Sequence, residues 1–241
     1  MRAQTMSERI NPNIRFPAIR FGVIGFDLDG TLLDTAPDIA LALNHALQVA
    51  GRPALPLEQV RPMIGGGAKK LLAVALGGGD RVPADELDPL YRVLLDHYRT
   101  HIAVETRAYD GLEHALDALA ARGIRLGVAT NKLEALALQL LEKMGLASRF
   151  DCVVGGDTLG TDRAKPKPDM LHHLAQRCGG GPMAFVGDSA FDVKAAQAAG
   201  MPAIAVSFGY PGMPVGELGA DRVIDSYDEL LPALASLQQF G

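Results

Sequence analysis

The sequence is poor in cysteine and contains no long hydrophobic run. Among its 241 residues there are two cysteines, Cys152 and Cys178, which are too few and too far apart for a disulfide framework or a zinc site. No apolar stretch approaches the length that crosses a membrane, and residues 1–20 lack the apolar segment of a secretory signal. We therefore expect a cytoplasmic protein with no membrane partner, in which Cys152 is a buried thiol.

Blocks of like charge are also absent from the sequence. The 23 Lys and Arg residues and the 28 Asp and Glu residues give a formal net charge of −5, and both signs are spread along the chain. Nucleic-acid-binding arms carry basic blocks and acidic tails carry runs of Asp and Glu, so we expect neither. The remaining composition is that of a globular protein, 48% hydrophobic, which is long enough to bury a sizeable core.

The first 20 residues show no helix or strand pattern. They include several arginines but no apolar stretch. We expect a disordered leader over residues 1–20, with an Arg-rich transit peptide or a true start at Met6 as the alternatives.

From residue 21 onward, strand patterns alternate with helix patterns. The run FGVIGF at 21–26 is continuously apolar, which is typical of a strand covered on both faces of a parallel sheet. Further strands are expected at 124–129, 150–154, 184–186, 203–206 and near 223, and helices at 111–122, 133–144, 168–178, 191–199 and from 227. This alternation predicts an α/β fold with a doubly wound parallel sheet.

The segment 35–105 interrupts this alternation because it contains no convincing strand. One helix is expected between an N-cap at Asp34 or Thr35 and a stop at Gly51. A second is expected from about Asp88 to Ile102, with Leu90, Leu94, Tyr98 and His101 near one stripe. We therefore expect an all-helical insert at 35–105, between residues 21–34 and 106–241 of an α/β core.

Polar residues follow three of the expected strands. Asp27 ends the first, Thr130 and Asn131 follow the strand at 124–129, and Asp188 follows the strand at 184–186. Ligands of open α/β sheets bind at the carboxyl ends of the strands, so these side chains should converge. Clustered acids raise one another's pKa unless a cation intervenes, and hard oxygen ligands suit Mg²⁺. The pattern therefore predicts phosphoryl transfer at a Mg²⁺ site.

Asp27 and Asp29 lie two residues apart and can point to the same side of an extended chain. One carboxylate can attack phosphorus and form an aspartyl-phosphate, while the other protonates the leaving oxygen and later activates water. The Thr130 hydroxyl and Lys165 would stabilise the charge on the transferring oxygens. Gly30 would let the chain turn away sharply after the acid pair.

Four short motifs resemble, in order, those of the haloacid dehalogenase superfamily of phosphohydrolases. They are DLDGT at 27–31, ATN at 129–131, KPKP at 165–168 and GDSAFD at 187–192. The resemblance implies that Asp27 is the nucleophile, that Asp29 is the general acid/base, and that Thr130 and Lys165 bind phosphate. We place Asn131 with these phosphate-binding residues.

The resemblance also implies a metal site and a second domain. Mg²⁺ would be held by Asp27, the Asp29 backbone carbonyl and Asp188, with Ser189 and Asp192 behind these ligands. The helical insert would be the family's cap, which closes over the substrate. Lys165, which begins the K-P-x-P pattern, takes the lysine role, and Lys167 is expected to be a solvated neighbour.

One loop of the insert bears on the substrate. MIGGGAKKLL at 63–72 resembles the cap loop of phosphoglycolate phosphatases, and GGDT at 155–158 also occurs in that group. We expect N–H groups at Gly65, Gly66 and Gly67 to face the substrate. Arg61 or Lys69 could meet a substrate carboxylate, although a solvated charge is the competing interpretation for each.

The sequence therefore predicts a Mg²⁺-dependent phosphatase whose partner is a small phosphorylated metabolite, with 2-phosphoglycolate as the first candidate. A phosphosugar phosphatase, acting for example on an amino-sugar acid phosphate, and a phosphomutase are the alternatives within the fold. A signalling receiver that is phosphorylated on Asp is the alternative from another class. The oligomeric state, monomer or homodimer, stays open.

Overall fold

The computed structural model describes residues 18–237, apart from the side chain of Asp80. Most of the expected leader therefore lies outside the described residues. Six parallel strands form the main sheet in the order β5-β4-β1-β6-β7-β8. Their bounds are β1 Val23–Phe26, β4 Arg125–Ala129, β5 Cys152–Val154, β6 Met183–Gly187, β7 Ala203–Val206 and β8 Arg222–Ile224. This confirms the predicted parallel α/β sheet.

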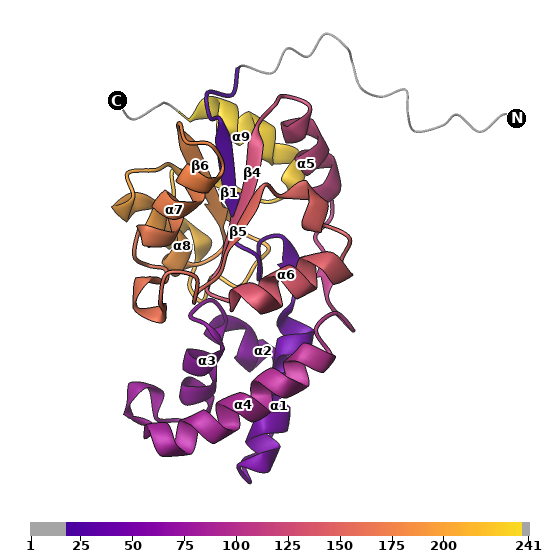
Figure 1. Cartoon of the computed structure of the whole chain (residues 1–241), viewed down its shortest axis with the longest axis vertical. Coiled ribbons are helices and arrows are strands. Elements are labelled where there is room, and N and C mark those ends of the chain that lie inside the picture. Colours follow the sequence, from indigo (N-terminus) through magenta and orange to yellow (C-terminus); the bar gives the residue numbers. More distant parts are fainter. Residues whose placement is uncertain (1–17, 238–241) are drawn as a thin grey trace, which may run out of the picture.

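Helices cover both faces of this sheet (Figure 1). One apolar core lies between the sheet and α5 (Leu112–Ala120), α6 (Glu134–Lys143) and α9 (Leu230–Ser236). The other lies between the sheet and α7 (Asp169–Arg177) and α8 (Ala190–Ala198). All four residues of β1 are buried, which explains why its sequence is continuously apolar rather than alternating.

The cysteines meet in the second of these cores. Cys152 on β5 is buried, as expected, and its Sγ lies 2.8 Å from Sγ of Cys178 at the end of α7. This contact could not be predicted from the sequence, because the two residues approach only through the packing of α7 against β5.

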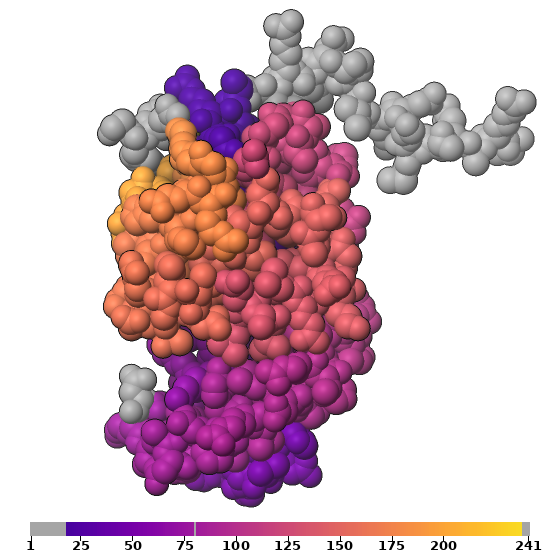
Figure 2. Space-filling model, in the orientation of Figure 1, coloured from indigo at the N-terminus to yellow at the C-terminus, as the bar shows by residue number. Residues whose placement is uncertain are grey.

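Four helices of the inserted segment form a separate layer beyond the carboxyl ends of the strands (Figure 1). They are α1 (Ala36–Val49), α2 (Leu57–Val60), α3 (Ala68–Ala75) and α4 (Ala84–Thr100). Figure 2 shows this layer, in indigo and magenta, packed directly against the sheet domain. The division of the chain at residues 34/35 and 105/106 stays a prediction.

Short segments join the two layers where the chain leaves the sheet and returns. The two-residue strands β2 (Leu33–Asp34) and β3 (Arg107–Ala108) pair in antiparallel register, although neither is among the strands expected from the sequence. Asp38 in the first turn of α1 is buried and accepts hydrogen bonds from the backbone N–H groups of Val104, Glu105 and Thr106. The outgoing and returning chain are thereby tied together.

Two expectations for the inserted helices need correction. Thr35 is the N-cap of α1, but its side chain makes no capping bond, because its hydroxyl donates to Asp29 Oδ1 at 2.7 Å. Helix α4 begins at Ala84 rather than near Asp88, and His101 is an exposed residue after its last turn rather than part of the buried stripe. The buried stripe of α4 is Leu87, Leu94 and Tyr98.

Within residues 18–237, no helix is long and apolar enough to cross a membrane.

Candidate active site

The strand order places the predicted acids at one point. β1 lies between β4 and β6, so the residues after these three strands meet at the same sheet edge. The carboxylate oxygens of Asp27, Asp188 and Asp192 lie within 4.8 Å of one another, and all three residues are buried. Gly30, with φ of +82°, turns the chain away after the acid pair, and a Cβ there would collide with the Asp188 carboxylate.

Lys165 reaches this acid cluster from the loop before α7. Its Nζ lies 2.7 Å from Asp27 Oδ1 and 2.6 Å from Asp192 Oδ1, and its side chain is 1% exposed. Burial alone would lower the pKa of Lys165, but the carboxylates of Asp192 and Asp27 raise it above its ordinary value. The lysine is therefore a fixed cation beside Asp27. Lys167 is exposed, as expected for a solvated neighbour.

The acid cluster holds more negative charge than Lys165 neutralises. Burial raises the pKa of Asp27 to about 7, with repulsion from Asp192 and Asp29 adding to the rise and Lys165 opposing it. Burial and the charges of Asp192 and Asp27 also raise the pKa of Asp188 well above its usual range. Buried carboxylates that repel one another, all offering oxygen ligands, fit a small divalent cation such as Mg²⁺. Asp27 and Asp188 are the side chains suited to hold it.

Ser189 and Asp192 support this arrangement from α8. Asp192 Oδ2 accepts hydrogen bonds from the Ser189 N–H at 3.0 Å and the Ser189 hydroxyl at 2.6 Å. The pair forms a capping box that begins α8. The other Asp192 oxygen binds Lys165, so the same carboxylate fixes both the helix start and the lysine.

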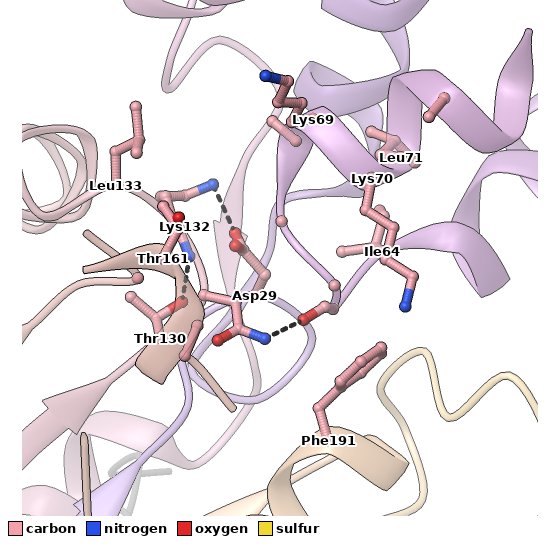
Figure 3. Close-up of a pocket in the computed structure, with 18 of the residues that line it drawn as sticks. Asp29, Ile64, Lys69, Lys70, Leu71, Thr130, Lys132, Leu133, Thr161 and Phe191 are labelled. Carbon is pink, nitrogen blue, oxygen red and sulfur yellow. Dashed lines mark hydrogen bonds and ion pairs between the residues drawn. The ribbon is translucent and has the colours of Figure 1, made fainter. Parts of the chain in front are cut away.

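Asp29 has a different set of partners. Its Oδ1 accepts the Thr35 hydroxyl at 2.7 Å and lies 2.9 Å from Lys132 Nζ (Figure 3). Lys132 and Asp29 are almost enclosed, with side chains 7% and 10% exposed. Lys132 is not among the site residues predicted from the sequence. The available signal was its position, directly after the motif ATN.

Thr130 and Asn131 follow β4, as predicted, but their side chains do different things. Thr130 is buried, and its hydroxyl oxygen accepts the Lys132 N–H at 3.2 Å. The Asn131 side chain donates to the backbone carbonyls of Gly65 at 2.8 Å and Lys165 at 3.0 Å, and it accepts the Lys165 N–H at 3.0 Å. The side chain of Asn131 therefore connects the loop of Gly65 to the loop of Lys165, and the predicted phosphate contact of Asn131 stays a prediction.

A cavity of about 1020 Å³ lies between these residues and the inserted helices. Asp27, Asp29, Thr130 and Lys165 line its sheet end. The cap end is lined by the expected glycine loop, by Lys69 and Lys70, and by apolar side chains including Ile64, Leu71, Leu87 and Leu94. Figure 3 shows Lys69 and Lys70 on α3, across the cavity from Lys132. The cavity joins a charged wall to a mainly apolar one.

The two basic residues that we considered for a substrate carboxylate are both paired with acids. Arg61 is not among the described residues that line the cavity. Its Nη2 lies 3.0 Å from Asp34 Oδ2, and its guanidinium lies over the Tyr210 ring. Lys69 does line the cavity, but its Nζ lies 2.6 Å from Asp88 Oδ1. The geometry therefore favours a structural ion pair for Arg61.

The chain is similar to known proteins of one family. The family model described as haloacid dehalogenase-like hydrolase matches residues 24–206. A protein named phosphoglycolate phosphatase from Agrobacterium fabrum is 42% identical over 214 residues, covering 87% of this chain and 90% of that protein. One of the same name from Nitrosospira multiformis is 44% identical over 211 residues, covering 84% and 91%.

Solved structures show the same architecture. A predicted phosphoglycolate phosphatase from Haemophilus somnus superposes with a TM-score of 0.80 at 30% identity, covering 88% of this chain and 97% of that one. The protein CbbY from Rhodobacter sphaeroides, in complex with xylulose-(1,5)bisphosphate, gives a TM-score of 0.74 at 26% identity, covering 89% and 99%.

Proposed function

The chain belongs to the haloacid dehalogenase-like hydrolases, and from this premise we propose that it is a Mg²⁺-dependent phosphatase that hydrolyses 2-phosphoglycolate to glycolate and phosphate. That it is a phosphoric monoester hydrolase follows from the family and from the relatives named phosphoglycolate phosphatase. The mechanism, the metal and the substrate are the parts proposed here. The observation that carries them is the buried carboxylate of Asp27, held 2.7 Å from Lys165 at the floor of a capped cavity.

In the first step the Asp27 carboxylate attacks phosphorus. A bond from its oxygen to phosphorus forms as the ester P–O bond breaks, and the leaving oxygen takes a proton from Asp29. Lys165 and the Thr130 hydroxyl bind the transferring oxygens, whose negative charge grows in the transition state. When bound by Asp27, Asp188 and the Asp29 backbone carbonyl, Mg²⁺ supplies further neutralisation of that charge.

In the second step water hydrolyses the aspartyl-phosphate. Asp29, now ionised, takes a proton from the water, whose oxygen attacks phosphorus while the bond to Asp27 breaks. Free phosphate leaves and the Asp27 carboxylate is restored. The helical insert at 35–105 acts as a cap over the core formed by 21–34 and 106–241, and its apolar wall keeps other water away from the intermediate.

A sugar phosphate is the second candidate substrate. Two observations favour it: the cavity is larger than a two-carbon acid needs, and CbbY, a structural neighbour, holds a sugar bisphosphate. A phosphosugar phosphatase would release phosphate from such an ester. A phosphomutase would return the phosphoryl group to the sugar instead.

The test is phosphate release from a panel of small phosphate esters with Mg²⁺, compared by kcat/KM. We expect 2-phosphoglycolate to lead by at least about tenfold, which corresponds to about 1.4 kcal/mol of transition-state discrimination. A sugar phosphate that led instead would overturn the substrate assignment and keep the chemistry. Isomerised sugar phosphate without free phosphate would indicate a mutase.

The metal assignment has its own test. Protein stripped with a chelator and assayed in metal-free buffer should release no phosphate from any ester of the panel, and added Mg²⁺ should restore the activity. Full activity of the stripped protein would contradict the proposed metal site.

A further inference from the structure

A lysine and a tyrosine enclose the side of Asp29 that faces the cap. Lys132, from the loop after β4, places its Nζ 2.9 Å from Asp29 Oδ1. Tyr98, from the last turns of α4, places its ring over that ammonium, with 4.5 Å between Nζ and the ring centroid. Both residues line the cavity. The core and the cap thus each contribute one polar side chain beside the proposed general acid.

Among the described residues, no group accepts the proton of the Tyr98 hydroxyl, whose polar neighbour is the Lys132 ammonium. The residue is 4% exposed, and its oxygen is buried. Burial raises the pKa of Tyr98 to about 12, so the hydroxyl keeps its proton and can donate it. A buried hydroxyl whose proton has no acceptor is destabilising, and such groups in native proteins usually serve a ligand or an ordered water. This hydroxyl belongs to the wall of a ligand-sized cavity.

The Lys132 ammonium also has an N–H donor that is available to a ligand. Lysine offers three N–H donors, and its polar neighbours are Asp29 and the Tyr98 oxygen, so at least one donor stays available. The cap cations are less available near Asp29. Lys69 is paired with Asp88, and Lys70 lies over the Phe191 ring at 5.0 Å.

The shape of the proposed substrate brings its carboxylate to this place. In 2-phosphoglycolate a single methylene separates the leaving oxygen from the carboxyl carbon. Asp29 has to lie about 3 Å from the leaving oxygen in order to protonate it. The substrate carboxylate is one methylene away from the leaving oxygen. It must therefore lie beside Asp29 and close to Lys132.

We propose that the Lys132 ammonium and the Tyr98 hydroxyl together bind the carboxylate of the substrate. This inference rests on the proposed function. These two residues then determine specificity for the leaving group, which is the part of the substrate that is not transferred to the enzyme. Since Lys132 belongs to the core and Tyr98 to the cap, a bound carboxylate bridges the two and favours the closed cap. An ester without the acid lacks this bridge.

The test compares two esters of similar size. One is 2-phosphoglycolate, and the other is 2-hydroxyethyl phosphate, in which an uncharged alcohol replaces the carboxylate. The measured quantity is the ratio of their kcat/KM values. Tyr98→Phe should lower this ratio about tenfold and Lys132→Met about a hundredfold, the range expected for hydrogen bonds to a charged group. Lys132→Met should also slow 2-hydroxyethyl phosphate, because Asp29 loses its partner.

Two controls separate this role from a structural one. Tyr98→Phe keeps the ring and removes a buried hydroxyl whose proton has no acceptor, so its Tm should stay close to that of the wild type. Tyr109 is a second tyrosine with a buried hydroxyl, whose polar neighbour is Tyr210, and it does not line the cavity. Tyr109→Phe should leave the ratio unchanged.

The outcomes distinguish this inference from the proposed function. A wild-type enzyme that favours 2-phosphoglycolate, with a ratio unchanged in Tyr98→Phe and Lys132→Met, would overturn the carboxylate site and leave the proposed function standing. A wild-type enzyme that hydrolyses both esters equally well would overturn the proposed substrate and the carboxylate site together. A fall in the ratio for both variants, with Tyr109→Phe unaffected, is the expected result.

Discussion

The sheet end and the cap end of the cavity are built in different ways. At the sheet end, buried charged groups follow the strands, and each is fixed by another motif. Asp27 binds Lys165, Lys165 binds Asp192, and Asp192 begins α8 together with Ser189. At the cap end, the wall is mostly apolar side chains and glycines, with few polar groups. The fixed charged groups of the sheet end suit catalysis of a single reaction, whereas the apolar wall of the cap end, with its few polar groups, suits recognition of one substrate.

Apolar packing and several polar contacts connect the two ends. Asp38 ties α1 to the returning chain, β2 pairs with β3, and Asn131 bonds to the carbonyl of Gly65. Arg61 on the cap side adds an ion pair with Asp34. Changes at the sheet end should therefore slow the hydrolysis of every ester, and changes in the cap should alter the order of preference among esters. Changes at the residues that connect the two ends should have effects of intermediate size.

Asp27→Asn should have the largest effect, and it tests whether the sheet end alone carries the chemistry. Without a nucleophilic carboxylate no aspartyl-phosphate can form, so phosphate release should fall to background for every ester of the panel. An ester that was still turned over at the wild-type rate would contradict the role of Asp27 as nucleophile.

The same substitution should raise stability while it removes activity. Burial raises the pKa of Asp27 to about 7 from an ordinary 3.8, so folding disfavours the ionised carboxylate. The resulting penalty is absent below about pH 4, grows as the pH rises to about 7 and is then constant. Metal-free Asp27→Asn should therefore have a higher Tm than metal-free wild type at pH 8 and a similar Tm at pH 4. Added Mg²⁺ should raise the Tm of the wild type more than that of the variant.

Asp29→Asn should have a smaller effect that depends on the leaving group. Glycolate is a poor leaving group and needs the proton from Asp29, so its ester should be cleaved about 10² to 10⁴ times more slowly. p-Nitrophenol leaves without a proton, so the first step should survive and the second should stall. Rapid mixing should then show a burst of one p-nitrophenolate for each active site. Wild-type rates on the glycolate ester would contradict the acid/base role.

The sheet end could be predicted from the sequence because its signals are local. Asp27, Thr130 and Asp188 each directly follow an apolar run, and parallel strands bring their carboxyl ends to one edge. The strand order β4-β1-β6 then places these residues side by side. The motif resemblance depends on the same local patterns.

The cap end could not be predicted in this way, because its contacts depend on how distant helices pack. Tyr98 is 34 residues from Lys132 in the chain, and the stripe of α4 that contains Tyr98 does not show that its ring meets Lys132. The strands β2 and β3 are two residues long, too short for any periodicity. The sequence position of Asn131 likewise could not show that its side-chain amide bonds to the backbone of Gly65 and Lys165.

Asn131→Ala tests the contact that connects the Gly65 loop of the cap to the Lys165 loop. Loss of its three bonds should release the Gly65 loop and the Lys165 loop together, and a misplaced Lys165 should lower kcat by up to about 100-fold for every ester. Asn44 offers a matched control, because its side chain also makes two backbone bonds, both to Leu55, away from the cavity. Asn44→Ala should lower the Tm and leave kcat unchanged. Equal kcat values for the two variants would contradict the positioning role of Asn131.

Arg61→Gln should have the smallest effect. It distinguishes a residue that connects the cap to the sheet domain from the residues proposed to bind the substrate carboxylate. The guanidinium is paired with Asp34, with side chains 34% and 30% exposed, so the loss of the pair should cost less than about 1 kcal/mol of unfolding free energy. Since Arg61 is not among the described residues that line the cavity, the ratio of kcat/KM for 2-phosphoglycolate over 2-hydroxyethyl phosphate should not change. A fall in that ratio comparable to the one expected for Tyr98→Phe would mean that the cap shifts on binding and brings Arg61 to the carboxylate. The paired state of Arg61 would then belong to the ligand-free enzyme, and recognition would be shared between the cap and the residues that connect it to the sheet end.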